Sequence, residues 1–412
     1  MRSSLFLCAF SMMVLSVHSL TLDEAVNNAL QNHPGLQVLQ ADIASAEGDR
    51  ISAGALPNPD LSIGPGVKHT SDAGASQSRF HGNLEISQTL EFPGKRTLRV
   101  FLSEGNIRLR QIALEGFRQQ LLIKVRRNYF QALAAKQIAL LRTEEVQSAQ
   151  TFLQSAHKRV EAGYASDFEL LKAQSDLIIA RKGLGQALGE ARISKLRLAG
   201  LMGIPADTIF EVEGKLDSIL FSSFKADPVA LALVRNSSIK AQTLQMELAG
   251  KNIEAAKLSH KPDLTLSPSL EYTDNEQVYG LNFSVPLPVW NRGKGDVQAA
   301  TAQQRSAQAE LEKLKQEIIL SVRTAMDKVR LAEEQRALYT PEFMEGSKSI
   351  LTRAEKVYGR NETTLLIYLE TRRAYFDALT DYYATLNQWA DSHLELEAAM
   401  GMPPETHQNG EP

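Results

Sequence analysis

The chain contains an internal duplication, and this repeat constrains its fold more than any other feature. Pro59-Asp60-Leu61 matches Pro262-Asp263-Leu264 at an offset of 203 residues. Further along, Leu84 and Leu90 match Leu281 and Leu287 at an offset of 197 residues. A register kept over most of a chain is the signature of a repeated structural unit. We predict a first repeat over 21–203, a linker over 204–226, a second repeat over 227–401 and a flexible tail over 402–412.

Each repeat contains two short segments in which apolar and polar residues alternate, as they do in β-strands. They predict one β-hairpin at about 60–92 and another at about 263–289. The pattern fits a barrel wall that faces lipid on one side and water on the other, and it fits a soluble half-buried hairpin equally well. Four strands cannot close a barrel, because single-chain barrels start at about eight strands. Two or three chains would have to share one barrel, and the strand count leaves both numbers open.

Long helices are predicted for the rest of each repeat. Gly94 to Val160 spans about 65 residues, or roughly 100 Å at the helical rise per residue. A shorter helix follows from Asp167 to Met202, with a leucine or alanine every seven residues from Leu170 to Leu198 and mostly small residues three places later. Such a seam permits close antiparallel packing of helices. We expect the same long and short helices in the second repeat; a simple coiled-coil rod would share this pattern but would leave the hairpins unexplained.

The N-terminus predicts export. Arg2 precedes an apolar run from Leu5 to Val17, and Val17-His18-Ser19 places small residues where a signal peptidase requires them. We predict a signal peptide over 1–19. The only cysteine, Cys8, lies inside this segment, so the mature chain would have no disulfide. A net charge of −3 gives no reason to expect a nucleic-acid partner.

Several local motifs resemble those of the TolC-like outer-membrane efflux proteins. The opening Leu22-Asp23-Glu24-Ala25, the junctions 88–96 and 286–295, and the turn 163–171 follow one another in that family's order. The resemblance covers essentially the whole mature chain. The junction Glu91-Phe92-Pro93-Gly94-Lys95-Arg96 is most similar to the subgroup that is paired with heavy-metal exporters.

The resemblance implies a mainly α-helical fold with a small β part. Long antiparallel helices would form a periplasmic α-barrel, and each chain would contribute four strands to a trimeric 12-stranded β-barrel in the outer membrane. The function implied is a passive exit duct without cofactor or catalysis. It would receive substrates, heavy-metal cations in that subgroup, from an inner-membrane pump of the RND type through a periplasmic adaptor (membrane fusion protein). The alternative is a periplasmic coiled-coil structural or adaptor protein, which would fractionate without detergent.

The resemblance also assigns roles to individual residues. The two helical tips would meet the adaptor; a plain turn is the alternative for these candidates, which are Arg159, Gly163, Tyr164, Ser166, Tyr358, Gly359, Arg360 and Thr363. Glu370 would form a periplasmic gate, because three carboxylates around an axis attract cations and repel anions; a solvated helix face is the alternative. Phe92 and Trp290 are candidates for aromatics at the membrane interface, or for core packing. His69 and His81 flank the first hairpin loop, where contact with a metal is an open alternative.

Overall fold

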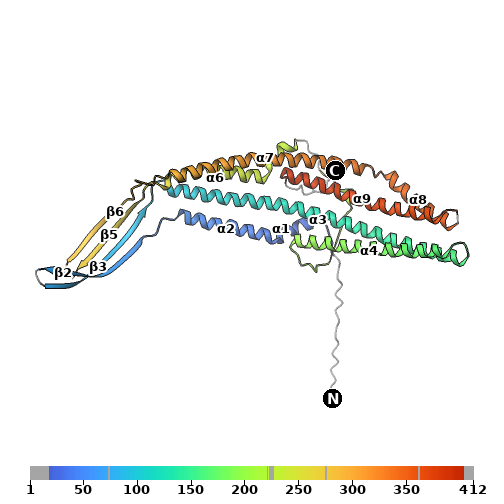
Figure 1. Cartoon of the computed structure of the whole chain (residues 1–412), viewed down its shortest axis with the longest axis horizontal. Helices are drawn as coiled ribbons and strands as arrows, with labels where there is room; N and C mark the ends of the chain where they lie inside the picture. Colours follow the sequence, from blue (N-terminus) through green and yellow to red (C-terminus); the bar gives the residue numbers. More distant parts are fainter. Residues whose placement is uncertain are drawn as a thin grey trace, which may run out of the picture. The chain divides into compact units, whose positions relative to one another are not determined.

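The structure, a computed structural model, describes residues 18–72, 75–219, 221, 227–273, 276–360 and 362–402. Residues 1–17 of the predicted signal peptide and 403–412 of the predicted tail lie outside this range. The chain forms two compact units built from separate segments (Figure 1). Unit 1 contains Met1–Pro34, Arg118–Ala230 and Ser321–Pro412, and unit 2 contains Gly35–Phe117 and Leu231–Leu320. The boundaries of the two repeats stay a prediction.

Unit 2 contains a four-stranded antiparallel sheet to which both repeats contribute. Its strands are β2 (Asp60–Asp72), β3 (Ala75–Leu90), β5 (Leu264–Thr273) and β6 (Glu276–Ser284). The strand order is β2-β3-β5-β6, so the two hairpins meet where β3 pairs with β5. Each outer strand, β2 and β6, pairs with one neighbour among the described strands.

The two faces of this sheet differ in polarity. Ile63 pairs with Leu84, Leu84 with Leu270, and Leu270 with Tyr279, so apolar side chains lie in rows across one face. The side chains of the outer strands are the most exposed, with Ile63 at 70% and Tyr279 at 76%, whereas Leu84 is 40% exposed and Leu270 is partly buried. A contiguous exposed apolar surface of this kind marks contact with a membrane or with another protein.

The second hairpin is shorter than the sequence predicts. Strand β6 ends at Ser284, whereas the alternating pattern continues to Val289. Pro286 and Pro288 have no backbone N–H and cannot continue a hydrogen-bonded ladder, so the segment leaves the sheet. Alternation alone therefore placed the end of this strand at Val289 instead of at Ser284.

Four helices connect to one end of the sheet (Figure 1). They are α2 (Pro34–Gly54), α3 (Lys95–Glu161), α6 (Ser237–Ser259) and α7 (Lys294–Ala337). Gly94 and Gly293 precede α3 and α7, and both adopt positive φ, of 96° and 72°. Glycine is favoured there because a side chain would strain this backbone conformation. No helix of the described chain is both long enough and apolar enough to cross a membrane.

Unit 1 is built mainly from helices. They include α1 (Leu22–Asn32), α4 (Asp167–Met202), α8 (Pro341–Gly359), α9 (Leu365–Met400) and the parts of α3 and α7 within this unit, and α5 (Pro228–Arg235) begins in it. A short parallel pair, β1 (His18–Leu20) and β4 (Phe210–Val212), lies beside a 3-10 turn, η1 (Leu216–Ser218). Thr21 and Glu24 form a capping box that starts α1. The core contains Leu198, Met202, Leu394 and Met400, all fully buried.

The second repeat breaks its long helix where the first does not. Residues 338–340 separate α7 from α8, and the Thr340 hydroxyl accepts the Phe343 N–H at 3.2 Å. Pro341 occupies the first turn of α8, a position that proline tolerates, whereas it breaks a helix interior. At the repeat offset of 197, Pro341 corresponds to Glu144, and α3 continues through that position. The prediction of one uninterrupted long helix in the second repeat was wrong because of this proline.

Replacing Gly203 with alanine should destabilise unit 1. Gly203 caps α4 with a φ of 67°, and an added Cβ would lie 2.5 Å from the Asn32 carbonyl oxygen. The left-handed conformation alone costs about 1–2 kcal/mol for a residue with a side chain. Gly200→Ala is the matched control, because nothing lies within 4 Å of its added Cβ in the same helix. We expect a lower thermal midpoint for Gly203→Ala by circular dichroism, and an unchanged or higher one for Gly200→Ala; equal midpoints would contradict the clash.

Candidate functional site

Unit 1 contains both predicted helical tips. The first tip joins α3 to α4 through residues 162–166, where Gly163 has a φ of 74° and the Tyr164 N–H donates to the Arg159 carbonyl at 2.8 Å. The second tip joins α8 to α9, and the Thr364 hydroxyl accepts the Ile367 N–H at 3.4 Å. Both returning helices therefore begin with a threonine or serine at the cap, as helix starts favour.

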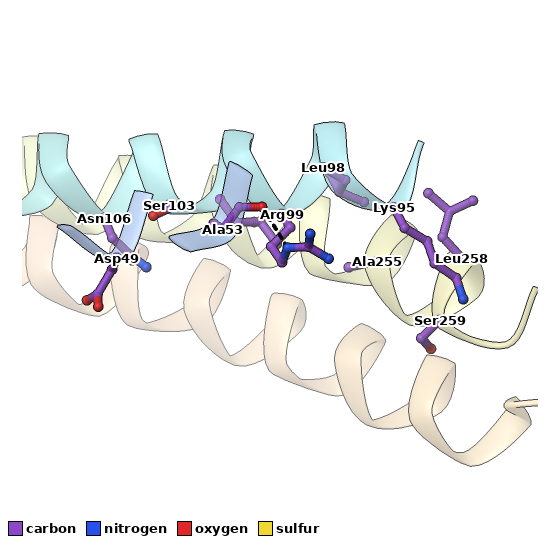
Figure 2. A pocket seen from close by; sticks show the side chains of 11 residues that line it. Asp49, Ala53, Lys95, Leu98, Arg99, Ser103, Asn106, Ala255, Leu258 and Ser259 are labelled. Carbon is purple, nitrogen blue, oxygen red and sulfur yellow. Dashed lines mark hydrogen bonds between the residues drawn. The ribbon is translucent and has the colours of Figure 1, made fainter. Parts of the chain in front are cut away.

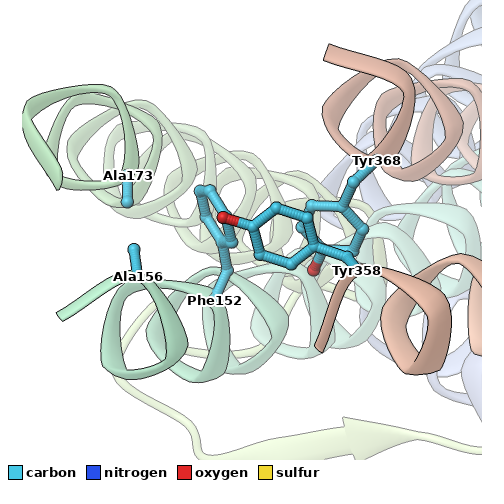
Figure 3. Close-up of a cluster of buried hydrophobic side chains, with 5 residues drawn as sticks. All are labelled: Phe152, Ala156, Ala173, Tyr358 and Tyr368. Carbon is cyan, nitrogen blue, oxygen red and sulfur yellow. The ribbon is translucent and has the colours of Figure 1, made fainter. Parts of the chain in front are cut away.

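An aromatic cluster holds the two tips together (Figure 3). The rings of Tyr358 and Tyr368 stack with their centroids 4.9 Å apart, and Phe152 lies 5.1 Å from Tyr368. Ala156 of α3 and Ala173 of α4 face one another beside the rings, and both are fully buried. Small residues at this crossing allow α3 and α4 to approach closely, so the rings from α8 and α9 fill the remaining space.

Polar contacts surround Tyr358. The guanidinium of Arg159 donates to the Tyr358 carbonyl at 2.8 Å and lies 4.4 Å from the centre of its ring. The Tyr358 hydroxyl donates to the Glu169 carboxylate. Burial, together with this carboxylate, raises the pKa of the Tyr358 hydroxyl well above its usual value. Tyr358 therefore stays neutral and links the second tip to α3 and α4 at every physiological pH.

A second polar link lies farther along the same helices. The Arg372 guanidinium on α9 approaches the Asp176 carboxylate on α4, with Nη2 2.5 Å from Oδ2. Arg372 is only 3% exposed, and its Nη1 has no hydrogen-bond partner among the described residues. A buried charge of this kind depends on its counter-ion, because water does not compensate it.

The predicted adaptor-contact residues have different environments. Gly163, Tyr164, Ser166, Gly359 and Arg360 are exposed, whereas Arg159 and Thr363 are partly buried. Tyr358 is 2% exposed, so its side chain belongs to the core beneath the tips and not to their surface. This corrects the role assigned to Tyr358 from the sequence, since a turn motif does not reveal which way a ring points.

Sequence reasoning missed several residues that organise the tips. Glu169, Asp176 and Arg372 form the polar links, and Phe152 and Tyr368 form the aromatic cluster. Phe168 is 72% exposed beside Tyr164, so the first tip has a larger aromatic surface than expected. The aromatic residues near each tip can be seen in the sequence. Which of them contact one another across the four helices cannot.

Glu370, the predicted gate residue, is exposed on α9. Ile367 lies one turn nearer the tip and is also exposed, and Asp377 lies two turns farther on the same side of the helix. Exposed carboxylates and apolar residues therefore share this face of α9. The protomer leaves the face open to solvent or to other copies.

The junction between sheet and helices in unit 2 is the other site that the motifs single out. Lys95 Nζ lies 2.9 Å from both Asp263 carboxylate oxygens, and the Phe92 N–H donates to Asp263 Oδ1 at 2.6 Å. Arg99 pairs with Glu91 and donates to the Ala53 carbonyl at 2.7 Å. The Glu-Phe-Pro-Gly-Lys-Arg motif thus ties β3 and α3 to the start of β5 and the end of α2.

Beside this junction lies a cavity of about 480 Å³ (Figure 2). Leu98 and Leu102 of α3, Ala53 of α2 and Leu258 of α6 make most of its surface apolar. Lys95 and Arg99 at its rim are already paired with acidic partners. Asp49 of α2 also lines the cavity, so its wall combines an apolar surface with one carboxylate.

The two predicted interface aromatics differ in environment, and the two histidines predicted to flank a loop lie within strands, His69 in β2 and His81 in β3. Phe92 is half-buried, whereas Trp290 is 95% exposed. His69 Nδ1 lies 2.7 Å from the Ser78 hydroxyl, and His81 Nδ1 lies 3.2 Å from the Thr273 hydroxyl. No group of three or more His, Cys, Asp or Glu side chains that could hold a metal occurs in the described part of the chain.

Comparisons with known proteins identify the family. A family model described as "Outer membrane efflux protein" matches residues 25–204 and 229–402. The cobalt-zinc-cadmium resistance protein CzcC of Cupriavidus metallidurans is 22% identical, over 93% of this chain and 90% of its own. The pyoverdine export outer membrane protein OpmQ of Pseudomonas aeruginosa is 24% identical, over 87% of this chain and 80% of its own.

Solved structures show the same fold. A structure of CusC matches with a TM-score of 0.79 and 17% identity, covering 92% of each chain. The outer-membrane channel OprN matches with a TM-score of 0.80 and 16% identity, covering 92% of this chain and 89% of its own. The chain belongs to the outer membrane efflux protein family. It is an outer-membrane efflux duct and not an enzyme, which confirms the fold, location and function predicted from the sequence motifs.

Removing the charge of Arg372 should destabilise the packing of α9 against α4. Arg372→Met leaves Asp176 without its counter-ion, and breaking a buried pair typically costs about 3–5 kcal/mol. Arg373→Met is the matched control, because that side chain is 85% exposed and its loss should change stability by less than about 0.5 kcal/mol. Urea unfolding in detergent measures both. Equal unfolding midpoints for the two variants would contradict a stabilising role for the buried pair.

Proposed function

We propose that three copies of this chain assemble into a passive exit duct of a tripartite efflux system. The observation that carries the proposal is the open four-stranded sheet. Its outer strands each have a neighbour on only one side among the described strands, and one face exposes apolar side chains. Unpaired backbone groups are costly in lipid, so the outer strands need partners in a membrane. Three sheets would give twelve strands, a number within the range of outer-membrane barrels.

The helices support assembly in the same way. Helix α4 exposes large apolar side chains along its length, among them Phe168, Leu171, Ile178, Ile179 and Leu188. Large apolar side chains that gather on a protein surface normally mark a contact with another protein or a membrane. We infer that neighbouring copies cover this surface and that the helices together enclose the periplasmic part of the duct.

We propose that the two tips meet the periplasmic adaptor, which connects the duct to an inner-membrane pump of the RND type. The exposed surface near the first tip includes Tyr164 and Phe168, and that of the second tip includes Arg360. Exposed aromatic and arginine side chains are enriched at protein interfaces because they bury large areas on contact. Arg159 and Tyr358 support this surface from below.

We propose heavy-metal cations as the cargo. CzcC is named for cobalt, zinc and cadmium resistance, whereas OpmQ is named for pyoverdine export. The polar face of the sheet carries Glu85 and Glu271 together with His81, on the side opposite the apolar rows. Carboxylates along a water-filled passage favour cations over anions.

Membrane fractionation and metal tolerance test this function. The protein should sediment with the outer membrane and remain trimeric in mild detergent. Deleting the gene should lower tolerance to cobalt, zinc or cadmium, and the intact gene on a plasmid should restore it. A soluble monomer would contradict the duct, whereas a trimeric outer-membrane protein whose loss leaves metal tolerance unchanged would contradict only the cargo.

Glu370 is proposed to line the periplasmic constriction. Glu370→Gln keeps the side-chain shape but removes three negative charges from the trimer, so cation selectivity should fall in planar-bilayer recordings. Glu190→Gln is the matched control, because Glu190 is an exposed carboxylate on α4 that pairs with Arg197. Identical reversal potentials for wild type and Glu370→Gln under a salt gradient would remove Glu370 from the constriction.

A further inference from the structure

The two junctions between sheet and helices correspond in the repeat, although the second is two residues longer, since Gly94 follows Leu90 by four residues and Gly293 follows Leu287 by six. Gly94-Lys95 starts α3 and Gly293-Lys294 starts α7, each with its glycine at positive φ. In each case the glycine carbonyl accepts the first backbone hydrogen bond of the helix, from Leu98 at 2.9 Å and from Val297 at 3.1 Å. Lys294 therefore occupies in the second repeat the place that Lys95 occupies in the first.

The first junction is closed within the chain. Because β3 pairs with β5, Asp263 at the entrance to β5 lies beside the start of α3. Its carboxylate accepts from Lys95 Nζ at 2.9 Å and from the Phe92 N–H at 2.6 Å. The pairing of β3 with β5 therefore brings together the two halves of the ion pair. Lys95 lies where β3 leads into α3, and Asp263 belongs to the Pro-Asp-Leu motif at the start of β5.

The second junction has the same lysine but lacks the acid. Lys294 is exposed and forms no ion pair within the described chain. The nearest carboxylate along the helix, Asp296, is held by His260 at 2.6 Å. Strand β6, which leads into this junction, has no neighbour on its far side among the described strands.

Asp60 is the counterpart of Asp263 in the first repeat, and it also lacks an ion-pair partner among the described residues. Asp60 is the first residue of β2 in the repeated Pro-Asp-Leu motif, and Asp263 lies immediately before β5 in the second copy of that motif. The Asp60 side chain is exposed. Strand β2 is the other outer strand of the sheet. An unpaired lysine lies at one edge and an unpaired aspartate at the other.

We propose that these two edges join between copies, so that Lys294 pairs with the partner subunit's Asp60. The strand pairing between copies follows from the β3–β5 register. Each β3 residue is replaced by its counterpart 197 residues later, and each β5 residue by its counterpart 203 residues earlier. Leu84 opposite Leu270 becomes Leu281 opposite the partner subunit's Val67. Leu90 opposite Leu264 becomes Leu287 opposite the partner subunit's Leu61.

This register places the side chains beyond Ser284 opposite the partner subunit's β2, although Pro286 and Pro288 cannot donate backbone hydrogen bonds there. Val285 and Leu287 continue the alternating pattern beyond Ser284 but are exposed and unpaired in the protomer. Between copies, Leu287 takes the position that Leu90 takes within the chain. The inference deepens the proposed trimer and rests on it, because it names the contacts that close each of the three seams.

Cross-linking tests the seam directly. Asp60→Cys/Lys294→Cys protein, purified from the outer membrane in detergent and treated with a short bismaleimide, should yield covalent dimers and trimers. Lys95→Cys/Asp263→Cys is the matched control, because the structure joins these positions within one chain and its product should remain monomeric in size. The four single-cysteine variants correct for unspecific reaction, including any at Cys8.

The outcomes separate the seam from the trimer itself. A protein that is trimeric by light scattering before treatment, yet yields no more covalent oligomer than the single-cysteine variants, overturns the pairing and leaves the trimer standing. A protein that is monomeric before treatment overturns the trimer and the seam together.

Charge exchange gives a second test that does not depend on cysteine chemistry. Asp60→Lys and Lys294→Asp should each reduce the fraction of trimer that survives heating in detergent, because each places like charges at the seam. The double variant Asp60→Lys/Lys294→Asp should restore the wild-type fraction. Asp60→Lys/Lys261→Asp makes the same net change with a different exposed lysine and should not restore it. Equal recovery in both double variants, or in neither, would overturn the specific pair.

Discussion

The fold depends on the need to pair every backbone hydrogen-bonding group of a sheet that enters lipid. Water satisfies an exposed strand edge in solution, but hydrocarbon does not, so only closed arrangements of strands persist there. One chain supplies four strands in the order β2-β3-β5-β6 and leaves β2 and β6 with one neighbour each. The apolar rows on one face of this sheet are stable only against lipid or another apolar surface. Both requirements support the proposal that the protomer is one part of a larger assembly.

The polar contacts at the outer edges of the sheet are also incomplete within one chain, and in our proposal they determine which edges join. Lys95 and Asp263 close one junction inside the chain, whereas Lys294 and Asp60 leave an equivalent pair open at the two edges. In unit 1, by contrast, Arg159 and Glu169 both contact Tyr358 within the protomer. The tips are thus tied internally while the sheet edges await another copy. The duplicated junction motif thus forms an ion pair inside the chain in one copy and, in our proposal, between chains in the other.

Most of the architecture could be predicted from the sequence because it depends on periodic patterns. Alternation located three strands well, and the heptad spacing from Leu170 to Leu198 located α4. Two errors came from prolines: Pro286 shortened β6, and Pro341 divided the second long helix. The tip residues were found as turn motifs, but the burial of Tyr358 and the Arg372–Asp176 pair depend on four helices meeting in space. Such contacts leave no local pattern in a single sequence.

We propose that three chains complete one pore. Single-particle imaging of the protein purified from the outer membrane in detergent or in lipid nanodiscs tests it most directly. We expect particles with threefold symmetry, a lumen that continues from the sheet region into the helices, and β6 of each copy beside β2 of the next. Particles containing one chain, or an assembly in which these two strands remain unpaired, would contradict it.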